Sequence, residues 1–254
     1  MTADYTWEDF SNPTLKEIRK QFKLHNFLKS KDEFASQLLL KEWVHYTLPN
    51  GIPETDYAYK SAIEILKDAQ LGKKFWCTQY AYVYLQCASA LGWYSRKLSI
   101  DSDHLKEEKD MHHGVIDIWS NQFNKWYVID PQNNIHYEKE GFPLNSLEIR
   151  NEYLKNKAKD IIGIIGNRKQ TVSFKEEDKG FNTPSNYFWF AISTRNNFLV
   201  EPGIFDVQMY LWVDNVNMSC KWHKGHDEHP MYKSQFIKTE NRSLCFPLMS
   251  TSAS

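Results

Sequence analysis

The chain has few cysteines and no long apolar run, and these two shortages exclude whole classes of protein. Four cysteines in 254 residues are too few for a small domain held together by disulfides. No stretch of about 20 apolar residues occurs, so we expect no insertion into a membrane. The opening residues, MTADYTWEDF, lack the basic and apolar regions of a secretory signal. The chain as written is expected to be cytoplasmic; if a signal peptide has been removed, it is extracytoplasmic.

The chain also has no large excess of either positive or negative charge. Lys and Arg number 31 against 32 Asp and Glu, which leaves a formal net charge of −1. No overall field therefore draws the chain to nucleic acid, and we expect no nucleic-acid partner. Internal repeats and long low-complexity linkers are also lacking. With 41% hydrophobic residues, the chain has enough apolar material for one large domain, or for a catalytic domain with a smaller appendage.

Helical spacing of apolar residues dominates the first part of the chain. It predicts helix over 13–48, and the turn-rich segment LPNGIPET (48–55) ends that pattern. A second helix is expected near 57–70. A third is expected over 77–91, where Gly92 provides a stop. The N-terminal half is therefore predicted to be helical.

Strand patterns dominate the rest of the chain. The segment 101–111 is a charged connection, 145–160 resembles a polar surface helix, and 160–169 is interpreted as a short buried segment. The chain from about 185 onward is expected to be β-rich, either extending the main sheet or forming a small appended lobe. Alternating or apolar patterns predict strands at 94–100, 113–119, 126–130, 187–192 and 205–213.

Cys77 stands where the third predicted helix begins. A thiol acts as a nucleophile in its thiolate form, so its pKa has to be lowered by an imidazolium, by a helix N-terminus, or by both. The free N–H groups and the dipole of a helix start favour a negative sulfur there. Phe75 and Trp76 directly precede the thiol and are expected to shield it from water. Cys77 is therefore our candidate nucleophile.

The hairpin formed by 113–119 and 126–130 supplies two further groups. With the turn centred on Asn121 and Gln122, His113 is predicted to lie directly opposite Asp130, with Cβ atoms about 5 Å apart. An aspartate in that place fixes the histidine tautomer and stabilises the imidazolium, which leaves the other ring nitrogen for Cys77. A shift of one residue would send the two side chains to opposite faces.

Each of these residues also has an ordinary explanation. A cysteine in an apolar helix usually packs in the core, a single histidine before a strand is usually unremarkable, and an aspartate before proline usually makes a turn. The order of the three residues, and the element that each occupies, favour the catalytic interpretation.

Three blocks of sequence carry a resemblance to the transglutaminase-like family of papain-type thiol enzymes. The blocks are FWCTQYAYVYLQCASALGWYSRKLSI, HGVIDIW and WYVIDP, within a region of about 40–137. The matching positions are Cys77, Ala81, Leu91, Gly92 and Arg96, then His113, Asp117 and Trp119, then Trp126, Asp130 and Pro131. The chain departs from the family pattern at Phe75, where glycine is frequent, at Asp117, where glutamate is usual, and at Val115, where an aromatic residue is common.

The resemblance implies an α+β fold, with a helical N-terminal half packed on an antiparallel sheet. It places a catalytic domain over 1–180, and the β-rich extension then covers 181–254. It assigns Cys77 as nucleophile, His113 as general base and acid, and Asp130 as the orienting group, with no cofactor. His113 is preferred to His112 because it keeps the spacing to the rest of its block. The family includes proteases, cross-linking acyltransferases and glycoprotein deglycosylases, so peptide, protein and glycoprotein substrates all stay open.

An enzyme of this type also needs donors for the oxyanion. The backbone N–H of Cys77 is one natural donor. Gln70 is the first candidate for a second donor, with Trp76 and Gln79 as rivals. The main alternative to an enzyme is a binding module for peptide or carbohydrate, which keeps the fold without turnover.

Two other features carry less chemistry. His223, His226 and His229 recur at every third position, a spacing that suits a metal site, but Gly225 and Pro230 favour an exposed loop, and no metal site is predicted. Cys87 is expected to lie in the core. Cys220 and Cys245 would be able to pair only in an oxidising compartment.

Overall fold

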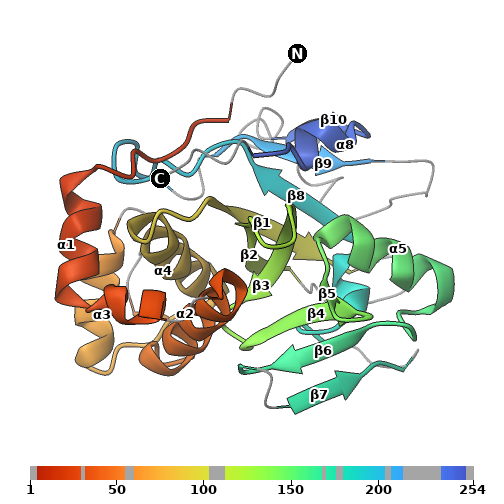
Figure 1. The fold of residues 1–254 in the computed structure, drawn as a ribbon, viewed down its shortest axis with the longest axis horizontal. Coiled ribbons are helices and arrows are strands. Elements are labelled where there is room, and N and C mark those ends of the chain that lie inside the picture. Colours follow the sequence, from red (N-terminus) through yellow and green to blue (C-terminus); the bar gives the residue numbers. More distant parts are fainter. Residues whose placement is uncertain are drawn as a thin grey trace.

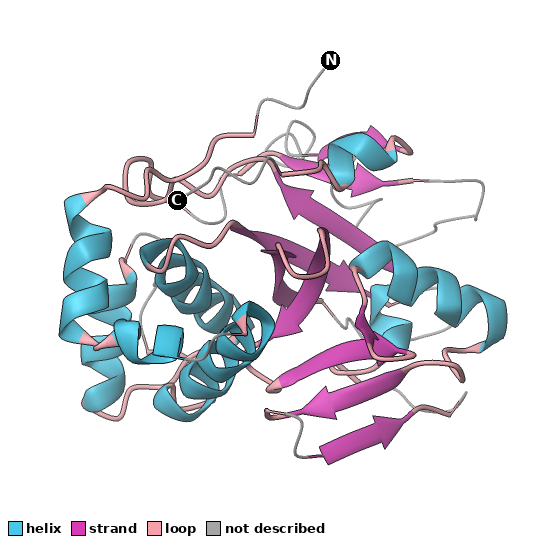
Figure 2. Ribbon diagram, viewed as in Figure 1, coloured by secondary structure: helices cyan, strands magenta, loops and turns pink. Residues whose placement is uncertain are grey.

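One large mixed sheet, with helices on both of its faces, organises the molecule (Figures 1 and 2). The computed structural model describes residues 5–29, 32–54, 60–102, 112–167, 170–175, 180–203, 207–213 and 236–249. The α+β class predicted from the sequence is confirmed. The sheet is mixed rather than purely antiparallel, because its last two strands run parallel.

The strands follow the order β10-β9-β8-β1-β2-β3-β4-β6-β7, and β5 pairs with β4 off this path. Of the described pairs, β9 with β10 is parallel and the others are antiparallel. The strands are β1 (Ser95–Asp101), β2 (His113–Ser120), β3 (Lys125–Asp130), β4 (Ile135–Lys139), β5 (Phe142–Pro143), β6 (Ile162–Ile165), β7 (Gln170–Ser173), β8 (Trp189–Ser193), β9 (Met209–Trp212) and β10 (Phe236–Thr239).

Four N-terminal helices cover one face of the sheet, and a fifth helix covers the other (Figure 1). The first group shares a core with Ile116, Ile118 and Ile129, whereas α5 and η2 pack with the opposite side chains of β1 and β2. The helices are α1 (Pro13–Gln21), α2 (Glu33–Thr47), α3 (Ala62–Gln70), α4 (Cys77–Ala90), α5 (Ser146–Asn156) and α8 (Arg242–Cys245), with 3₁₀ turns η1 (Leu24–Lys29) and η2 (Pro184–Tyr187).

The predicted helical stretch over 13–48 is divided into α1, η1 and α2. Lys23 takes a left-handed backbone angle, φ 53°, which an α-helix cannot contain. A fresh helix start then comes from Asp32, whose carboxylate accepts a hydrogen bond from the N–H of Ala35. The prediction missed this break because apolar spacing alone does not record a local change of φ.

The β2–β3 hairpin has a different register from the predicted one. Trp119 lies opposite Trp126, and Asp117 lies opposite Val128. The predicted register is wrong by two residues, because the turn contains four residues, 121–124, rather than two. A shift of two keeps every side chain on its expected face.

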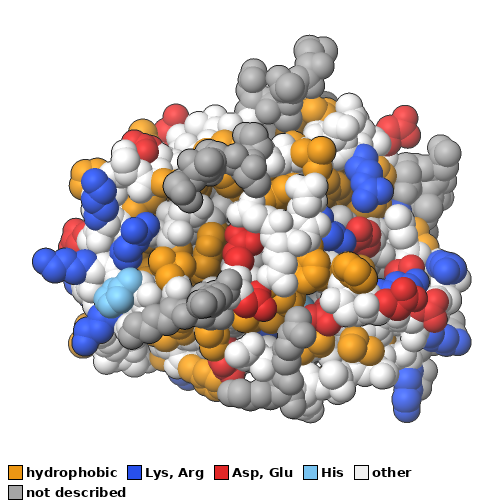
Figure 3. Space-filling model, viewed as in Figure 1, with side chains coloured by type: hydrophobic (Ala, Val, Ile, Leu, Met, Phe, Trp, Pro, Cys, Tyr) orange, Lys and Arg blue, Asp and Glu red, His pale blue; other side chains and the backbone are white. Residues whose placement is uncertain are grey.

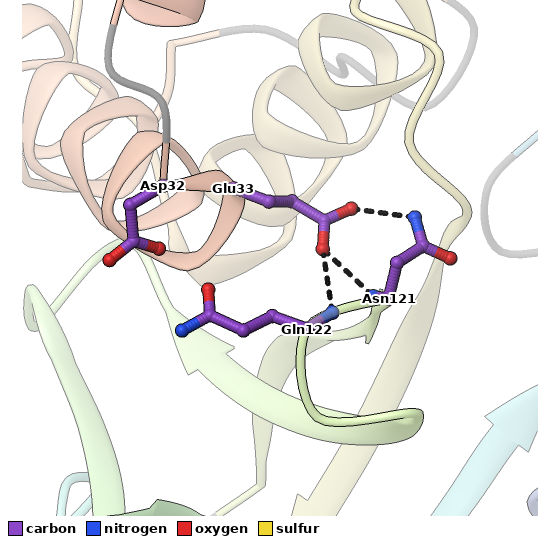
Figure 4. Close-up of a pocket in the computed structure, with 4 residues that line it drawn as sticks. All are labelled: Asp32, Glu33, Asn121 and Gln122. Atoms are coloured by element: carbon purple, nitrogen blue, oxygen red, sulfur yellow. Dashed lines mark hydrogen bonds between the residues drawn. The ribbon is translucent and has the colours of Figure 1, made fainter.

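A contact from α2 explains the longer turn. The Glu33 carboxylate accepts hydrogen bonds from the backbone N–H groups of Asn121 and Gln122, at 2.8 and 3.2 Å, and from the Asn121 amide (Figure 4). With Asp32, these residues line a shallow hollow at the start of α2. The contact joins residues that are 88 positions apart in sequence, so a rule based on the turn residues alone does not predict it.

The strands after residue 180 continue the main sheet. β8 pairs with β1 from Leu98 to Asp101, β9 pairs with β8, and β10 pairs with β9. Of the two arrangements left open by the sequence, the described strands adopt the extension. The buried segment predicted over 160–169 contains β6. This strand pairs with β7, which forms the edge of the sheet opposite to β10. Most of the charged connection predicted over 101–111 lies outside the described residues.

The N-terminal segment is tied to the chain near residue 195. Thr6 bridges Arg195, the Glu8 N–H donates to the Asn196 side chain, and the Glu8 carboxylate accepts from the Leu199 N–H at 3.0 Å. The Asn196 amide in turn donates to the Ser95 carbonyl on β1 at 2.7 Å. Two segments that are distant in sequence are thereby joined beside the sheet.

The surface carries both charge signs. Figure 3 shows acidic and basic side chains interspersed on one face of the molecule, with hydrophobic atoms between them. Within the described part of the chain, no helix has the length and apolar character needed to cross a membrane.

Candidate active site

Cys77 is the first residue of α4 and is partly buried. Phe75 is fully buried and bridges Asn50, which fixes the chain just before the helix. Trp76, which directly precedes the thiol, is 52% exposed. Most of α4 beyond its first turn is buried, so the helix is held firmly and its N-terminal end presents Cys77 at the surface.

Gly114 on β2 lies against this helix end. A Cβ atom at that position would lie 3.8 Å from the Cys77 Sγ and 3.6 Å from the Thr78 Oγ1. These are ordinary contact distances, so the thiol lies directly beside the strand that carries His113. Sequence reasoning overlooked Gly114, although its place next to the predicted histidine was a usable signal.

His113 and Asp130 are hydrogen-bonded to each other. The His113 Nε2 lies 2.8 Å from the Asp130 Oδ2, and both side chains are almost completely buried. In the observed register the two residues are diagonal neighbours rather than directly opposed. The imidazole bridges this diagonal because both side chains leave the same face of the hairpin.

Three groups besides His113 also bind the Asp130 carboxylate. Its Oδ1 accepts from the backbone N–H groups of Gln132 and Asn133, each at 3.0 Å. The Asn133 amide donates to Oδ2 at 2.7 Å and lies 3.3 Å from the His113 Nε2. An aspartate accepting from its own turn two and three residues on is a common motif, but the amide of Asn133 was not foreseen.

The charges in this cluster shift one another's pKa. Burial raises the pKa of the Cys77 thiol, but its hydrogen bond with His113 and the charge of that ring outweigh burial, and the pKa is lowered overall. The Gly114 N–H and Thr78 act in the same direction. Burial opposes the charged form of His113, yet Asp130 and Cys77 raise its pKa to about 10. Burial likewise opposes ionisation of Asp130, but His113 and Asn133 lower its pKa.

Nε2 of His113 faces Asp130, so Nδ1 is the ring nitrogen available for the thiol. The structure thus brings Cys77, His113 and Asp130 into one cluster, which can hold a thiolate beside an imidazolium. Phe181 also packs near the imidazole, with ring centroids 5.7 Å apart. Nothing in the local sequence pointed to Phe181, because it comes from a segment far beyond the histidine in the chain.

Solved structures with a distant likeness to this chain include the following three. A protein from Cytophaga hutchinsonii described as a candidate cysteine protease superposes with a TM-score of 0.38 and 12% identity, over 66% of this chain and 54% of that one. LapG from Legionella pneumophila gives a TM-score of 0.32 at 18% identity, over 46% and 69% of the two chains. The EGTA-treated form of LapG gives 0.34 at 18%, over 53% and 75%.

This chain spans about half the length of the first of these structures. All three TM-scores are low, so the likenesses carry no weight in assigning a function. A scan against protein-family models found no match, and a search of curated proteins found none either.

The residues predicted to serve the oxyanion occupy different settings. The side-chain oxygen of Gln79 accepts from the Trp76 backbone N–H at 3.1 Å, and Gln79 is buried, so this side chain stabilises the start of α4. Gln70 is exposed at the last position of α3. Trp76 lies at the surface, next to Cys77 in the chain. The role of all three stays a prediction.

The remaining thiols differ from Cys77. Cys87 and Cys245 are buried, and burial raises the pKa of each, that of Cys245 to about 12. Cys87 therefore lies in the core, as expected. Cys220 and the loop with His223, His226 and His229 fall outside the described residues. Among the residues that are described, no group of three His, Cys, Asp or Glu is placed to hold a metal ion.

Proposed function

We propose that this protein is a cysteine-dependent enzyme acting on amide or related acyl bonds, on a papain/transglutaminase-like fold. Cys77 is the nucleophile, His113 the general base and acid, and Asp130 the residue that orients and charges the imidazole. The observation that carries this proposal is the thiol at the start of α4, its pKa lowered by a histidine that a buried carboxylate holds at 2.8 Å.

The proposed reaction has two halves. The Cys77 thiolate attacks the carbonyl carbon, and the backbone N–H of Cys77 donates to the oxygen that becomes negative. The C–N bond then breaks, His113 gives its Nδ1 proton to the leaving amine, and a thioester remains on Cys77. Water or a second amine, deprotonated by His113, attacks the thioester and restores the thiol.

A peptide, protein or glycoprotein is the substrate that this proposal expects. Hydrolysis and transfer to an amine use the same three groups, so the choice between protease, amidase, glycoprotein deglycosylase and cross-linking enzyme depends on the acceptor and the substrate. We also propose that residues 1–180, with a core at 40–137, form the catalytic part. Strand β1 of this part pairs with β8, the first strand after residue 180.

The first test is the pH dependence of Cys77 alkylation by iodoacetamide, followed by mass spectrometry of the peptide that contains it. A free thiol titrates at about pH 8.5. Wild type is expected to react readily well below pH 7. His113→Ala is expected to lose this low-pH reactivity, since burial of the thiol is then no longer offset.

His112→Ala is the matched control, because it removes the adjacent, partly exposed histidine. It is expected to retain the wild-type profile. Equal loss in both variants would reject the assignment of His113. A wild-type thiol that titrates like a free cysteine would reject the enzyme and favour the binding module.

If the profile supports the thiolate, incubation with glutamine-containing and glycosylated peptides follows. The measured quantities are the mass of an acyl adduct on Cys77 and the amine released. An adduct that Cys77→Ala cannot form, turned over by water or by added amine, distinguishes hydrolysis from transfer.

A further inference from the structure

Three polar side chains form a stripe on the sheet-facing side of α2. Gln37, Lys41 and His45 recur at every fourth position, which places them on one face of the helix. Gln37 and Lys41 are completely buried, and His45 is partly buried. A buried polar stripe on a core helix is unusual unless each group has a partner.

Lys41 binds the sheet where β4 begins and the neighbouring strand β6 ends. Its Nζ donates to the Asn134 carbonyl at 2.9 Å and to the Gly166 carbonyl at 3.1 Å, and it lies 3.5 Å from the His136 Nδ1. Asn134 immediately precedes β4, and Gly166 immediately follows β6. Burial lowers the pKa of Lys41 to about 7, although nearby carboxylates, that of Asp130 foremost, oppose that shift. Both the ammonium and the neutral amine supply the two N–H groups that the carbonyls accept.

His45, one helical turn later, reaches the same turn of the sheet. Its Nδ1 lies 2.8 Å from the Gln132 carbonyl oxygen, so that nitrogen carries a proton and donates. Lys41 and His45 therefore hold two carbonyls of the segment 131–134, the turn between β3 and β4. This segment is also the one whose N–H groups bind the Asp130 carboxylate.

A third contact links this turn to the thiol. The Gln132 side-chain amide donates to the Asn50 side chain at 2.8 Å, and Asn50 bridges Phe75, two residues before Cys77. The turn that carries the carboxylate's donors is thus fixed to α2 on one side and to the approach to Cys77 on the other.

We propose that Lys41 and His45 are positioning residues that set the orientation of Asp130, and through it of His113, by fixing the turn 131–134. This inference rests on the proposed function of the cluster. Neither residue touches the thiol or the imidazole in the described structure; each acts through the backbone carbonyls that it binds. Removing His45 takes the α2 donor from the Gln132 carbonyl, and removing Lys41 takes it from the Asn134 and Gly166 carbonyls, so each change releases one contact between the turn and α2. The Asn134 carbonyl still accepts from the Gly166 N–H at 2.9 Å.

Two variants and a matched control test the inference in the full-length protein. Lys41→Met keeps the length of the side chain and removes its N–H groups. His45→Ala removes a partly exposed ring, so it carries the test if the buried substitution prevents folding. Leu38→Ala is the control: it lies on the same helix and is fully buried, and its side chain belongs to the apolar core.

The first readout is hydrogen exchange of the Gln132 and Asn133 amides, which donate to Asp130. In Lys41→Met their exchange is expected to accelerate about tenfold or more relative to amides in the middle of α4. His45→Ala is expected to show a smaller change in the same direction. Leu38→Ala is expected to change these two amides no more than the α4 amides.

The second readout is the alkylation profile of Cys77. Lys41→Met is expected to react about tenfold more slowly at pH values below the wild-type thiol pKa and at the wild-type rate well above it, as a rise of one unit in the thiol pKa requires. Leu38→Ala is expected to keep the wild-type profile.

The two readouts separate the two proposals. Unchanged exchange at Gln132 and Asn133 in both variants, or an alkylation profile shared with Leu38→Ala, overturns the positioning role. A wild-type thiol that behaves like a free cysteine overturns the proposed function, whatever the exchange data show.

Discussion

Replacing Asp130 with asparagine removes one charge from the buried cluster at almost unchanged size. The side-chain oxygen of the asparagine is still able to accept from the N–H groups of Gln132 and Asn133. The new amide nitrogen, however, takes the place of Oδ2, toward which the His113 Nε2 and the Asn133 amide both point. Donors then face donors, and the imidazolium loses its counter-charge.

The size of the effect follows from the pKa of His113. Asp130 and Cys77 together raise it from 6.5 to about 10 against burial, which corresponds to about 5 kcal/mol for the two partners at about 1.36 kcal/mol per unit, with Asp130 the larger contributor. Breaking a buried ion pair by removing one partner costs about 3–5 kcal/mol. We therefore expect Asp130→Asn to lower the free energy of unfolding by about that amount.

The pH window also follows from these values. The folded pKa of His113 lies above its unfolded value, so the stability from this group is fully present below about pH 6.5. It is lost as the pH rises through about 10. Above about pH 10 the imidazole is neutral in wild type too, so Asp130→Asn lacks only hydrogen bonds to a neutral ring. The difference in the free energy of unfolding between variant and wild type should then shrink to about 1 kcal/mol.

The assay is urea unfolding at pH 5.5 and pH 10.5, with both proteins in a Cys77→Ala background so that the thiol does not titrate. Without Cys77 the pKa of His113 falls below about 10, so pH 10.5 still lies above it. Asp68→Asn is the control, because Asp68 pairs with Lys60 and Lys73 at partly exposed positions. It should cost under about 1 kcal/mol. A loss for Asp130→Asn that is the same at both pH values would refute the buried ion pair.

Two further predictions concern the packing around the cluster. Gly114→Ala should leave alkylation unchanged and alter stability by less than about 1 kcal/mol, since the methyl group makes ordinary contacts with Thr78 and Cys77. Gly114→Val should cost about 1–3 kcal/mol and reduce low-pH alkylation, because its extra methyl groups displace the start of α4; equal results for the two variants would contradict this close approach. Truncation after residue 180 should yield a protein without cooperative thermal unfolding by circular dichroism, because β1 loses its partner β8; a soluble fragment with a reactive thiol would instead show a separable extension.

The candidate cluster was predictable because its parts are local. Cys77 begins a helix with a strong apolar pattern, and the strands with His113 and Asp130 are joined by a short turn. The register was wrong by two residues, so His113 and Asp130 are diagonal rather than opposed, but they still meet because such an error does not change the face.

The supporting residues were not predictable in the same way. Glu33 sets the turn from a distant helix, and Lys41 and His45 hold backbone carbonyls that are far away in sequence. A lysine and a histidine within a helical pattern resemble ordinary surface residues. Only the packing of α2 on the sheet shows that Lys41 is buried with partners.

The order of the chain has a consequence for how the protein is made. Cys77, His113 and Asp130 belong to one continuous stretch, formed by α4 and the neighbouring strands β1, β2 and β3. The bridge between Thr6 and Arg195, by contrast, closes a loop that spans most of the chain. Because β1 also needs its partner β8, the sheet around the cluster should be completed only after the strands beyond residue 180 have left the ribosome. A nascent chain that ends before β8 would then contain Cys77, His113 and Asp130 without the ordered cluster, and the thiol would become reactive late in synthesis.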